Sequence, residues 1–275
     1  MEHPHPPHLS KWPMFVGVGS FLSLFGLVVQ LYWGNPILLV LGLVLVILSM
    51  AGWAWEDFAD RIPEMDHGTR ELWPFGSLSN VQFGTIVFIS GDLAFVGAMV
   101  GAYAFTTWQA AYFSDPLLSL AASGSTLLTE LILLSLVGSI ALAMVGLYGA
   151  RSRNLALAET GIVGTIVLGG LFLVASVLNW QTLTNSGMGM STVGVNLTTS
   201  MFYDFSIIHI VHVVALIGVM GYFAVRVPKL FELPDHSMGP DGNKAGSPFD
   251  GLAAATYLWV FIAAFGIVLT AVFLM

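Results

Sequence analysis

The sequence predicts an all-α integral membrane protein with seven transmembrane helices, and three observations support this fold class. Hydrophobic residues make up 56% of the 275 residues and charged residues only 9%, whereas a soluble domain carries roughly 25% charged residues. The apolar runs between the charged segments reach about 20 residues or more, the length that an α-helix needs to cross the hydrocarbon core. Basic residues occur only in alternate connections between these runs, as expected for loops that return to one side of a membrane.

The first two apolar runs predict a helical hairpin. Trp12 and Trp33 bracket the first run, as aromatic side chains do at the two membrane interfaces. Gly34, Asn35 and Pro36 follow at once, and this turn signal indicates a tight connection to the second run. The seven expected helices cover residues 13–33, 36–55, 81–108, 118–148, 157–180, 201–227 and 252–275.

The polar segments between the helices predict the domain organisation. Residues 1–56 form a tail and the hairpin, residues 57–80 a cytoplasmic loop, and residues 81–275 a bundle of five helices. Two further long loops are expected, one rich in Gly, Ser, Thr and Asn from residue 182, and one rich in acids over residues 228–250.

The positive charges predict the orientation of the chain. They lie in the N-terminal tail and in the connections after the second, fourth and sixth helices, so the positive-inside rule places these segments in the cytoplasm and the C-terminus outside. The N-terminus lacks the charged start and the cleavage site of a secretory signal, so we expect the first helix to be retained. The eight basic residues are Lys11, Arg61, Arg70, Arg151, Arg153, Arg226, Lys229 and Lys244.

Several function classes are excluded by what the sequence lacks. It has no cysteine, which excludes disulfides, thiolate metal sites and iron–sulfur clusters. It has no phosphate-binding glycine loop, nucleophile elbow or basic nucleic-acid surface. No internal repeat is clear enough to suggest an inverted-repeat transporter, although a proton-coupled transporter that uses Asp92 stays as an alternative from another class.

Two histidines stand near the middle of the sixth expected helix. His209 and His212 are three residues apart, so they lie about 60° apart around the helix axis. They could form half of a metal site, but a haem with two axial histidines needs ligands from different helices. The other histidines are in polar segments, so we favour buried hydrogen-bonding roles and expect no metal on this chain. They are His3, His5, His8, His67 and His236.

Two carboxylates also fall well inside expected helices, away from the helix ends. Ionisable groups at membrane depth are costly, so they usually have a partner or a function. Asp92 lies near the centre of the third helix. Either it handles protons, or a neighbouring His, Ser or Thr satisfies it. Glu130 lies nearer the outer side of the fourth helix, and for it we favour packing or contact with another subunit.

Four short motifs, in order along the chain, resemble subunit III of the haem–copper oxidases. The sixth helix reads His-Ile-Val-His-Val from His209 to Val213 and is followed by Arg226, as the family has His-x-x-His-Val with a basic residue at the same distance. The third reads Phe-Ile-Ser-Gly-Asp and ends at Asp92, where the family has Phe-Ile-x-x-Glu, or Asp in its quinol oxidase branch. The resemblance thus puts Asp92 in the position of a buried family carboxylate.

The other two motifs belong to the hairpin. Trp-Pro at residues 12–13 and Trp-Ala-Trp-Glu-Asp at residues 53–57 are similar to the family's Trp-Pro start and Trp-Trp-Arg/Lys-Asp end. Trp53, Trp55 and Arg226 are therefore candidates for contact with lipid at the cytoplasmic interface.

The sequence also departs from the family pattern. Asn179 stands where the family has a second buried carboxylate, and residues 258–262 read Leu-Trp-Val-Phe-Ile in place of Trp-His-Phe-Val-Asp. These departures predict a distant, archaeal branch. The acidic, lysine-poor loops suit the salt-rich cytoplasm of a haloarchaeon, and ordinary acidic loops are the alternative explanation.

The resemblance implies a subunit of the cell membrane that has no catalytic residues and no redox centre. It would pack beside subunit I, with subunit II and small subunits as further partners, and the haems and copper of the catalytic subunits would reduce O2 to water and pump protons. The hairpin would splay from the five-helix bundle to hold phospholipid. The implied role is to support proton uptake and the access of lipid and O2. A subunit III-like accessory protein of a nitric oxide reductase is the alternative within the family.

Overall fold

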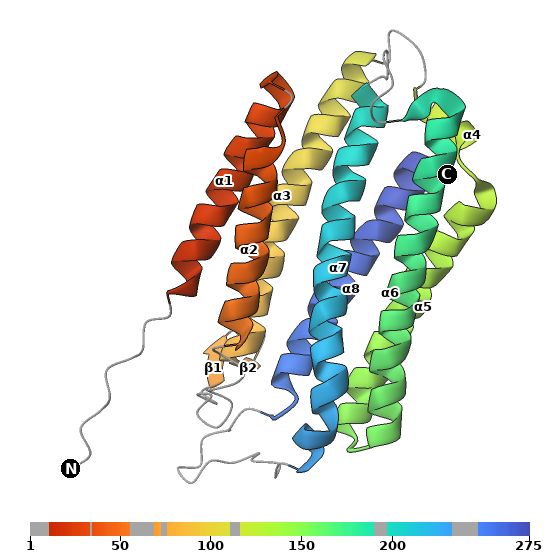
Figure 1. Ribbon diagram of the computed structural model, residues 1–275. Helices are drawn as coiled ribbons and strands as arrows, with labels where there is room; N and C mark the ends of the chain where they lie inside the picture. The colour runs from red at the N-terminus through yellow and green to blue at the C-terminus, as the bar shows by residue number, and fades with distance from the viewer. Residues whose placement is uncertain are drawn as a thin grey trace. The chain divides into compact units, whose positions relative to one another are not determined.

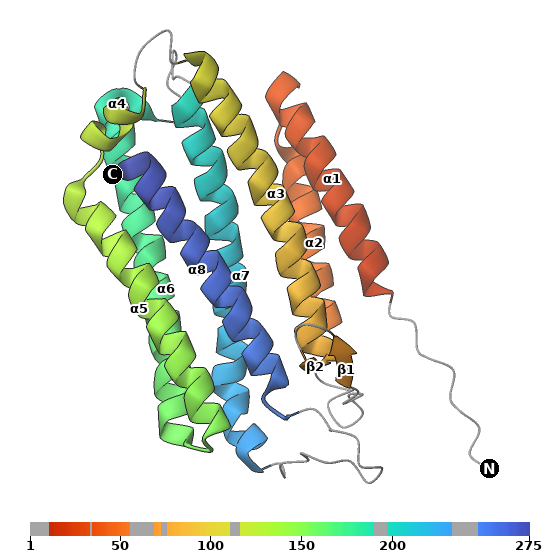
Figure 2. The same cartoon turned by 180° about the vertical axis from the view of Figure 1, so that it is seen from behind.

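The computed structural model describes residues 11–33, 35–55, 69–72, 76–110, 116–189, 197–232 and 247–275 (Figures 1 and 2). The chain divides into two compact units, Met1–Asp66 and His67–Met275. Each unit is considered by itself, and the predicted cleft between the hairpin and the bundle stays a prediction.

The first unit is a hairpin of two apolar helices, α1 (Trp12–Trp33) and α2 (Ile37–Trp55). Asn35 begins the second helix, because its Oδ1 accepts a hydrogen bond from the backbone N–H of Ile37 at 3.0 Å. A Cβ atom at Gly26 would collide with the backbone of Leu39. Small residues therefore let the two backbones approach closely, as in other membrane helix pairs.

The second unit begins with a two-stranded hairpin and continues as a helical bundle. The sequence did not predict this β-hairpin, in which Thr69 pairs with Ser79 in antiparallel register. The elements are β1 (Thr69–Leu72), β2 (Gly76–Ser79), α3 (Asn80–Ala110), α4 (Pro116–Ser123), α5 (Thr126–Arg151), α6 (Leu155–Leu183), the π-helical turn η3 (Thr184–Met188), α7 (Leu197–Glu232) and α8 (Asp250–Leu274).

Five of the described helices are long and apolar enough to cross a membrane. The hairpin helices contribute shorter apolar stretches, Met14–Ser23 and Ile37–Trp53, within their described residues. The protein is therefore a multi-pass helical membrane protein, and its count of seven spans and its orientation stay predictions. The five spans are Val81–Phe105, Thr126–Arg151, Leu155–Met188, Thr199–Glu232 and Asp250–Leu274.

The core of the bundle lies between α5, α6, α7 and α8, with α3 packed mainly against α8 (Figure 2). The closest approach is between α5 and α6, where a Cβ atom at Gly161 would collide with the backbone of Gly146. A second cluster of buried side chains closes the end of the bundle at which the chain terminates, with Leu120 of α4 at its centre (Figure 1).

The expected single helix over residues 118–148 is wrong. Gly124 and Ser125 interrupt it, so that α4 ends at Ser123 and α5 starts at Thr126. The Ser125 side chain accepts from the N–H of Leu128 at 3.4 Å, which is the usual way to begin a helix. The N–H of Ser125 in turn donates to Oδ1 of Asn179 on α6 at 3.3 Å. A contact between helices therefore stabilises this break, which the Ser-Gly-Ser sequence at residues 123–125 also favours.

Two helix ends also lie beyond their predicted positions. α6 continues past residue 180 into η3, and α7 runs through Pro228 to Glu232. A proline removes one backbone hydrogen bond from a helix. The turn after Pro228 stays helical here because Leu230 and Phe231 pack against the hydrophobic core of the bundle. Arg153 also donates to the carbonyl of Phe231 at 3.4 Å.

Candidate functional site

The structure joins two of the predicted site residues, Asp92 of α3 and His212 of α7. Nε2 of His212 lies 3.5 Å from Oδ1 of Asp92, and the two side chains are 28% and 11% exposed. The Nδ1 atom of His212 lies 2.8 Å from the carbonyl oxygen of Ile208. A carbonyl oxygen only accepts, so Nδ1 carries a hydrogen and the second ring nitrogen is left for Asp92.

This arrangement allows one proton to be shared across the pair. Either the carboxyl group of Asp92 is neutral and donates to Nε2, or the imidazole of His212 carries both hydrogens and faces a carboxylate. In the first state both side chains are uncharged, and in the second their charges are opposite, so neither state leaves an isolated charge at membrane depth. The sequence analysis left two interpretations of Asp92, a proton-handling carboxyl and a carboxyl satisfied by a neighbour, and the proximity of His212 is compatible with both.

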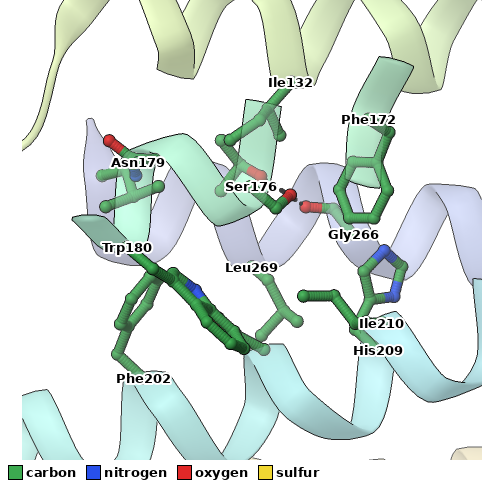
Figure 3. A pocket seen from close by; sticks show the side chains of 13 residues that line it. Ile132, Phe172, Ser176, Asn179, Trp180, Phe202, His209, Ile210, Gly266 and Leu269 are labelled. Atoms are coloured by element: carbon green, nitrogen blue, oxygen red, sulfur yellow. Dashed lines mark hydrogen bonds between the residues drawn. The ribbon is translucent and has the colours of Figure 1, made fainter. Parts of the chain in front are cut away.

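His209 points into the interior of the bundle (Figure 3). It is 3% exposed and lies edge-on to Phe172 of α6 and Phe265 of α8, with ring centroids 5.1 and 5.8 Å away. Neither ring nitrogen has a hydrogen-bond partner in the part of the chain that the structure describes. The two histidines therefore occupy different environments and do not converge on one ligand.

A small cavity borders His209. Its volume is about 30 Å³, and side chains of α5, α6, α7 and α8 line it. The polar members of the lining are Ser176, Asn179, Ser206, His209 and Thr270. Among the described residues, no group of three or more His, Asp or Glu side chains could hold a metal ion.

The other candidates fall at the surface or near it. Glu130, which the sequence analysis placed among the buried carboxylates, is exposed on the isolated chain, because it lies on the side of α5 that faces away from the core. Arg226 is half-buried and its guanidinium lies 5.6 Å from the centre of the Tyr222 ring. Trp53 is exposed, whereas the side chain of Trp55 lies outside the described residues, as do Glu56, Asp57 and the histidines of the tail and loops.

Two residues that depart from the family motifs have clear structural roles. Asn179 holds the break before α5. Trp259 is buried, and its Nε1 donates to Oγ of Ser139 at 3.1 Å, while that hydroxyl donates to the carbonyl of Leu136 at 2.7 Å. Sequence reasoning missed Ser139, since a serine in an apolar helix gives no signal of which helix it faces.

Comparison with known proteins connects this site with one family. No family model matches the chain. Over 231 residues, or 80% of the chain, it is 25% identical to the heme-copper oxidase subunit I+III of Aeropyrum pernix. It is 29% identical over 107 residues to cytochrome c oxidase subunit 3 of Pisaster ochraceus and 30% identical over 103 residues to that of Branchiostoma lanceolatum.

The matches cover only part of these relatives. The aligned part is 26% of the Aeropyrum protein, 38% of the Pisaster protein and 37% of the Branchiostoma protein. All three carry subunit III in their names, one of them is archaeal, and the motifs of α3 and α7 that suggested this family form the Asp92–His212 pair. These matches support a divergent member of the haem–copper oxidase subunit III family.

Proposed function

We propose that the protein is a non-redox subunit III of a respiratory haem–copper terminal oxidase. The observation that carries this proposal is the similarity, over 80% of the chain, to a protein named heme-copper oxidase subunit I+III. That name joins subunits I and III, which supports subunit I as the main contact of this chain. Subunit II and small subunits would complete an assembly in the cell membrane.

The exposed face of α3 supports a contact within the membrane. This span has the least buried apolar surface of the five, and it presents Val87, Phe88, Leu93 and Phe95 outward. Apolar side chains on a membrane helix need lipid or another helix against them, not water. Phospholipid and subunit I would provide these contacts, and the same face could give O2 an apolar route.

The Asp92–His212 pair supports a role in proton uptake. It lies within two membrane-spanning helices, where a polar pair that can exchange a proton is typical of proton paths. The two side chains are 28% and 11% exposed on the isolated chain, so polar groups or water at a contact with subunit I could reach the pair and exchange protons with it. The haems and copper would belong to the catalytic subunits.

Purification of the full-length chain from its native membranes in mild detergent tests the proposal. We expect a large haem-containing subunit to co-purify, the preparation to consume O2 with a suitable electron donor, and the chain freed of that subunit to show no Soret band. A stoichiometric Soret band on the chain alone would contradict the proposal.

The same preparation separates the alternatives. Reduction of nitric oxide without O2 consumption would identify a nitric oxide reductase accessory protein. Proton uptake by the chain alone in liposomes, lost in Asp92→Asn, would identify a transporter. Recovery of the complex in the cell-membrane fraction would establish its location.

A further inference from the structure

We infer that the cavity between α5, α6, α7 and α8 is a water-binding site inside the membrane domain, with His209 and Asn179 as its principal ligands (Figure 3). The inference rests on the interior of this chain alone and is independent of the proposed oxidase function.

The size of the cavity sets the class of ligand. A site needs about 10–15 Å³ of this kind of volume to hold one water molecule, and the cavity provides about 30 Å³. One or two water molecules fit, whereas a lipid chain, a quinone or a haem does not.

The buried groups around the cavity need hydrogen-bond partners that the described part of the chain does not give them. Asn179 is 1% exposed, and while its Oδ1 accepts from the N–H of Ser125, its Nδ2 has no acceptor among the described residues. Both ring nitrogens of His209 are in the same situation. A buried polar group without a partner bears the full cost of its desolvation, so filling the cavity with water is favourable.

Water meets the chemistry of both residues. The rings that flank His209, Phe172 and Phe265, carry no charge, and a buried imidazolium without a counter-charge would be very costly. A neutral imidazole has one donor and one acceptor nitrogen, and water can serve either one. The N–H groups of Asn179 need only an acceptor, which a water oxygen provides.

The other polar side chains that line the cavity provide the remaining hydrogen-bond partners of the bound water. A bound water needs two to four polar partners, and the hydroxyls of Ser176, Ser206 and Thr270 are at hand. Thr270 donates its hydrogen to the carbonyl of Gly266 at 2.8 Å, so its oxygen is free to accept. Gly266 is needed at this point, because a Cβ atom there would collide with Nε2 of His209.

Hydroxyl-radical labelling of the full-length chain in its native membranes tests the inference, because radicals formed from a bound water modify the side chains beside it. Phe172 and Phe202 line the cavity and are 4% and 5% exposed, while Phe205 and Phe273 are each 2% exposed and lie outside it. We expect the first two to be labelled severalfold faster than the second two. Equal rates for the two pairs would overturn the site.

A double variant tests the two ligands. His209→Phe with Asn179→Leu should reduce labelling of Phe172 to the rate of Phe205. In the control variant, Thr256→Val, which removes a buried hydroxyl outside the cavity, labelling should not change. Undiminished labelling of Phe172 in a folded double variant would overturn the assignment of these ligands.

A second measurement is independent of any variant. In a structure of the native assembly that resolves other waters, density should lie within hydrogen-bond distance of His209 and Asn179. An empty cavity in that map would overturn the inference. This measurement decides the question even if the double variant does not fold.

Discussion

At the scale of single residues, the two histidines of one short motif have opposite environments. His212 pairs with Asp92 at 3.5 Å on α3, and His209 is enclosed by aromatic rings. The sequence predicted two buried imidazoles, of which His209 is buried and His212 is 28% exposed, and left open whether Asp92 handles protons or is satisfied by a neighbouring side chain. It could not tell which histidine is the partner, because that depends on how α3 and α7 are rotated against each other, and no local pattern encodes this rotation.

The first prediction concerns the stability of this pair. In a double-mutant cycle with Asp92→Leu and His212→Leu, we expect each single variant to lose stability and the double variant to lose less than the sum. The coupling should be about 0.5–3 kcal/mol, as for residues in direct contact. Thermal unfolding in detergent measures it. The control on the same helix is Ser90→Ala, which removes an exposed hydroxyl that donates a hydrogen bond to the carbonyl of Ile86. A coupling energy near zero would mean that Asp92 and His212 do not interact.

The second prediction concerns turnover and rests on the proposed function. Asp92→Asn introduces an amide N–H that can donate to Nε2 of His212 but cannot release a proton at neutral pH. Oxygen reduction by the purified complex should begin at the wild-type rate, and either its duration over many turnovers or the number of protons pumped per electron should fall. Oxygen-electrode traces and proton release from vesicles measure both, and wild-type values in both would exclude a role for this carboxyl group.

At the scale of elements, the apolar helices were predictable and their interruptions were not. Length and hydropathy gave α1, α2, α3, α7 and α8 to within a few residues, apart from the last turns of α7. The break before α5 was missed, although Ser123, Gly124, Ser125 and Thr126 stand together at this point and form a turn signal within the apolar run. The amide of Asn179 that stabilises the break comes from 54 residues away. The extension past Pro228 likewise depends on Arg153, which belongs to another connection.

The third prediction uses a pair of glycines on α6. A Cβ atom at Gly161 would collide with the α5 backbone, whereas one at Gly170 meets nothing within 4 Å. Gly161→Ala should therefore lower stability by about 1–3 kcal/mol through overpacking. Gly170→Ala should be neutral or raise stability by up to about 1 kcal/mol through helix propensity. Unfolding of both variants in mixed micelles measures the difference, and a similar effect of the two substitutions would mean that α5 and α6 are not in close contact.

At the scale of the whole molecule, helix ends that carry basic residues lie on the same side of the bundle, although they are far apart in the sequence. α5 ends at Arg151, and α7 carries Arg226 and Lys229 towards its end. Figure 1 shows these helix ends on one side of the bundle, with α4 on the other. The resemblance to the family could be recognised because the motifs of α3 and α7 each lie within a single helix. The proteins that contact this chain could not be predicted in the same way, because no short motif in the sequence identifies a contact surface.

The fourth prediction tests the orientation. The chain has no cysteine, so a single introduced cysteine carries the only thiol of the chain that a maleimide can label. Ser152 and Ser186 are exposed and flank α6 at its two ends. In intact cells or spheroplasts, a membrane-impermeant maleimide should label Ser186→Cys and should reach Ser152→Cys only after lysis. The reverse pattern would invert the predicted topology.

The close packing of α5 on α6 also has a consequence for how the protein is made. Only residues 152–154 connect the two helices, Asn154 caps the second with a hydrogen bond of 3.1 Å to the N–H of Leu157, and their glycines allow backbone contact without help from other elements. We expect the two helices to enter the bilayer as a preformed pair during synthesis, before α7 and α8 leave the ribosome. The later helices would then find a finished surface on which to assemble.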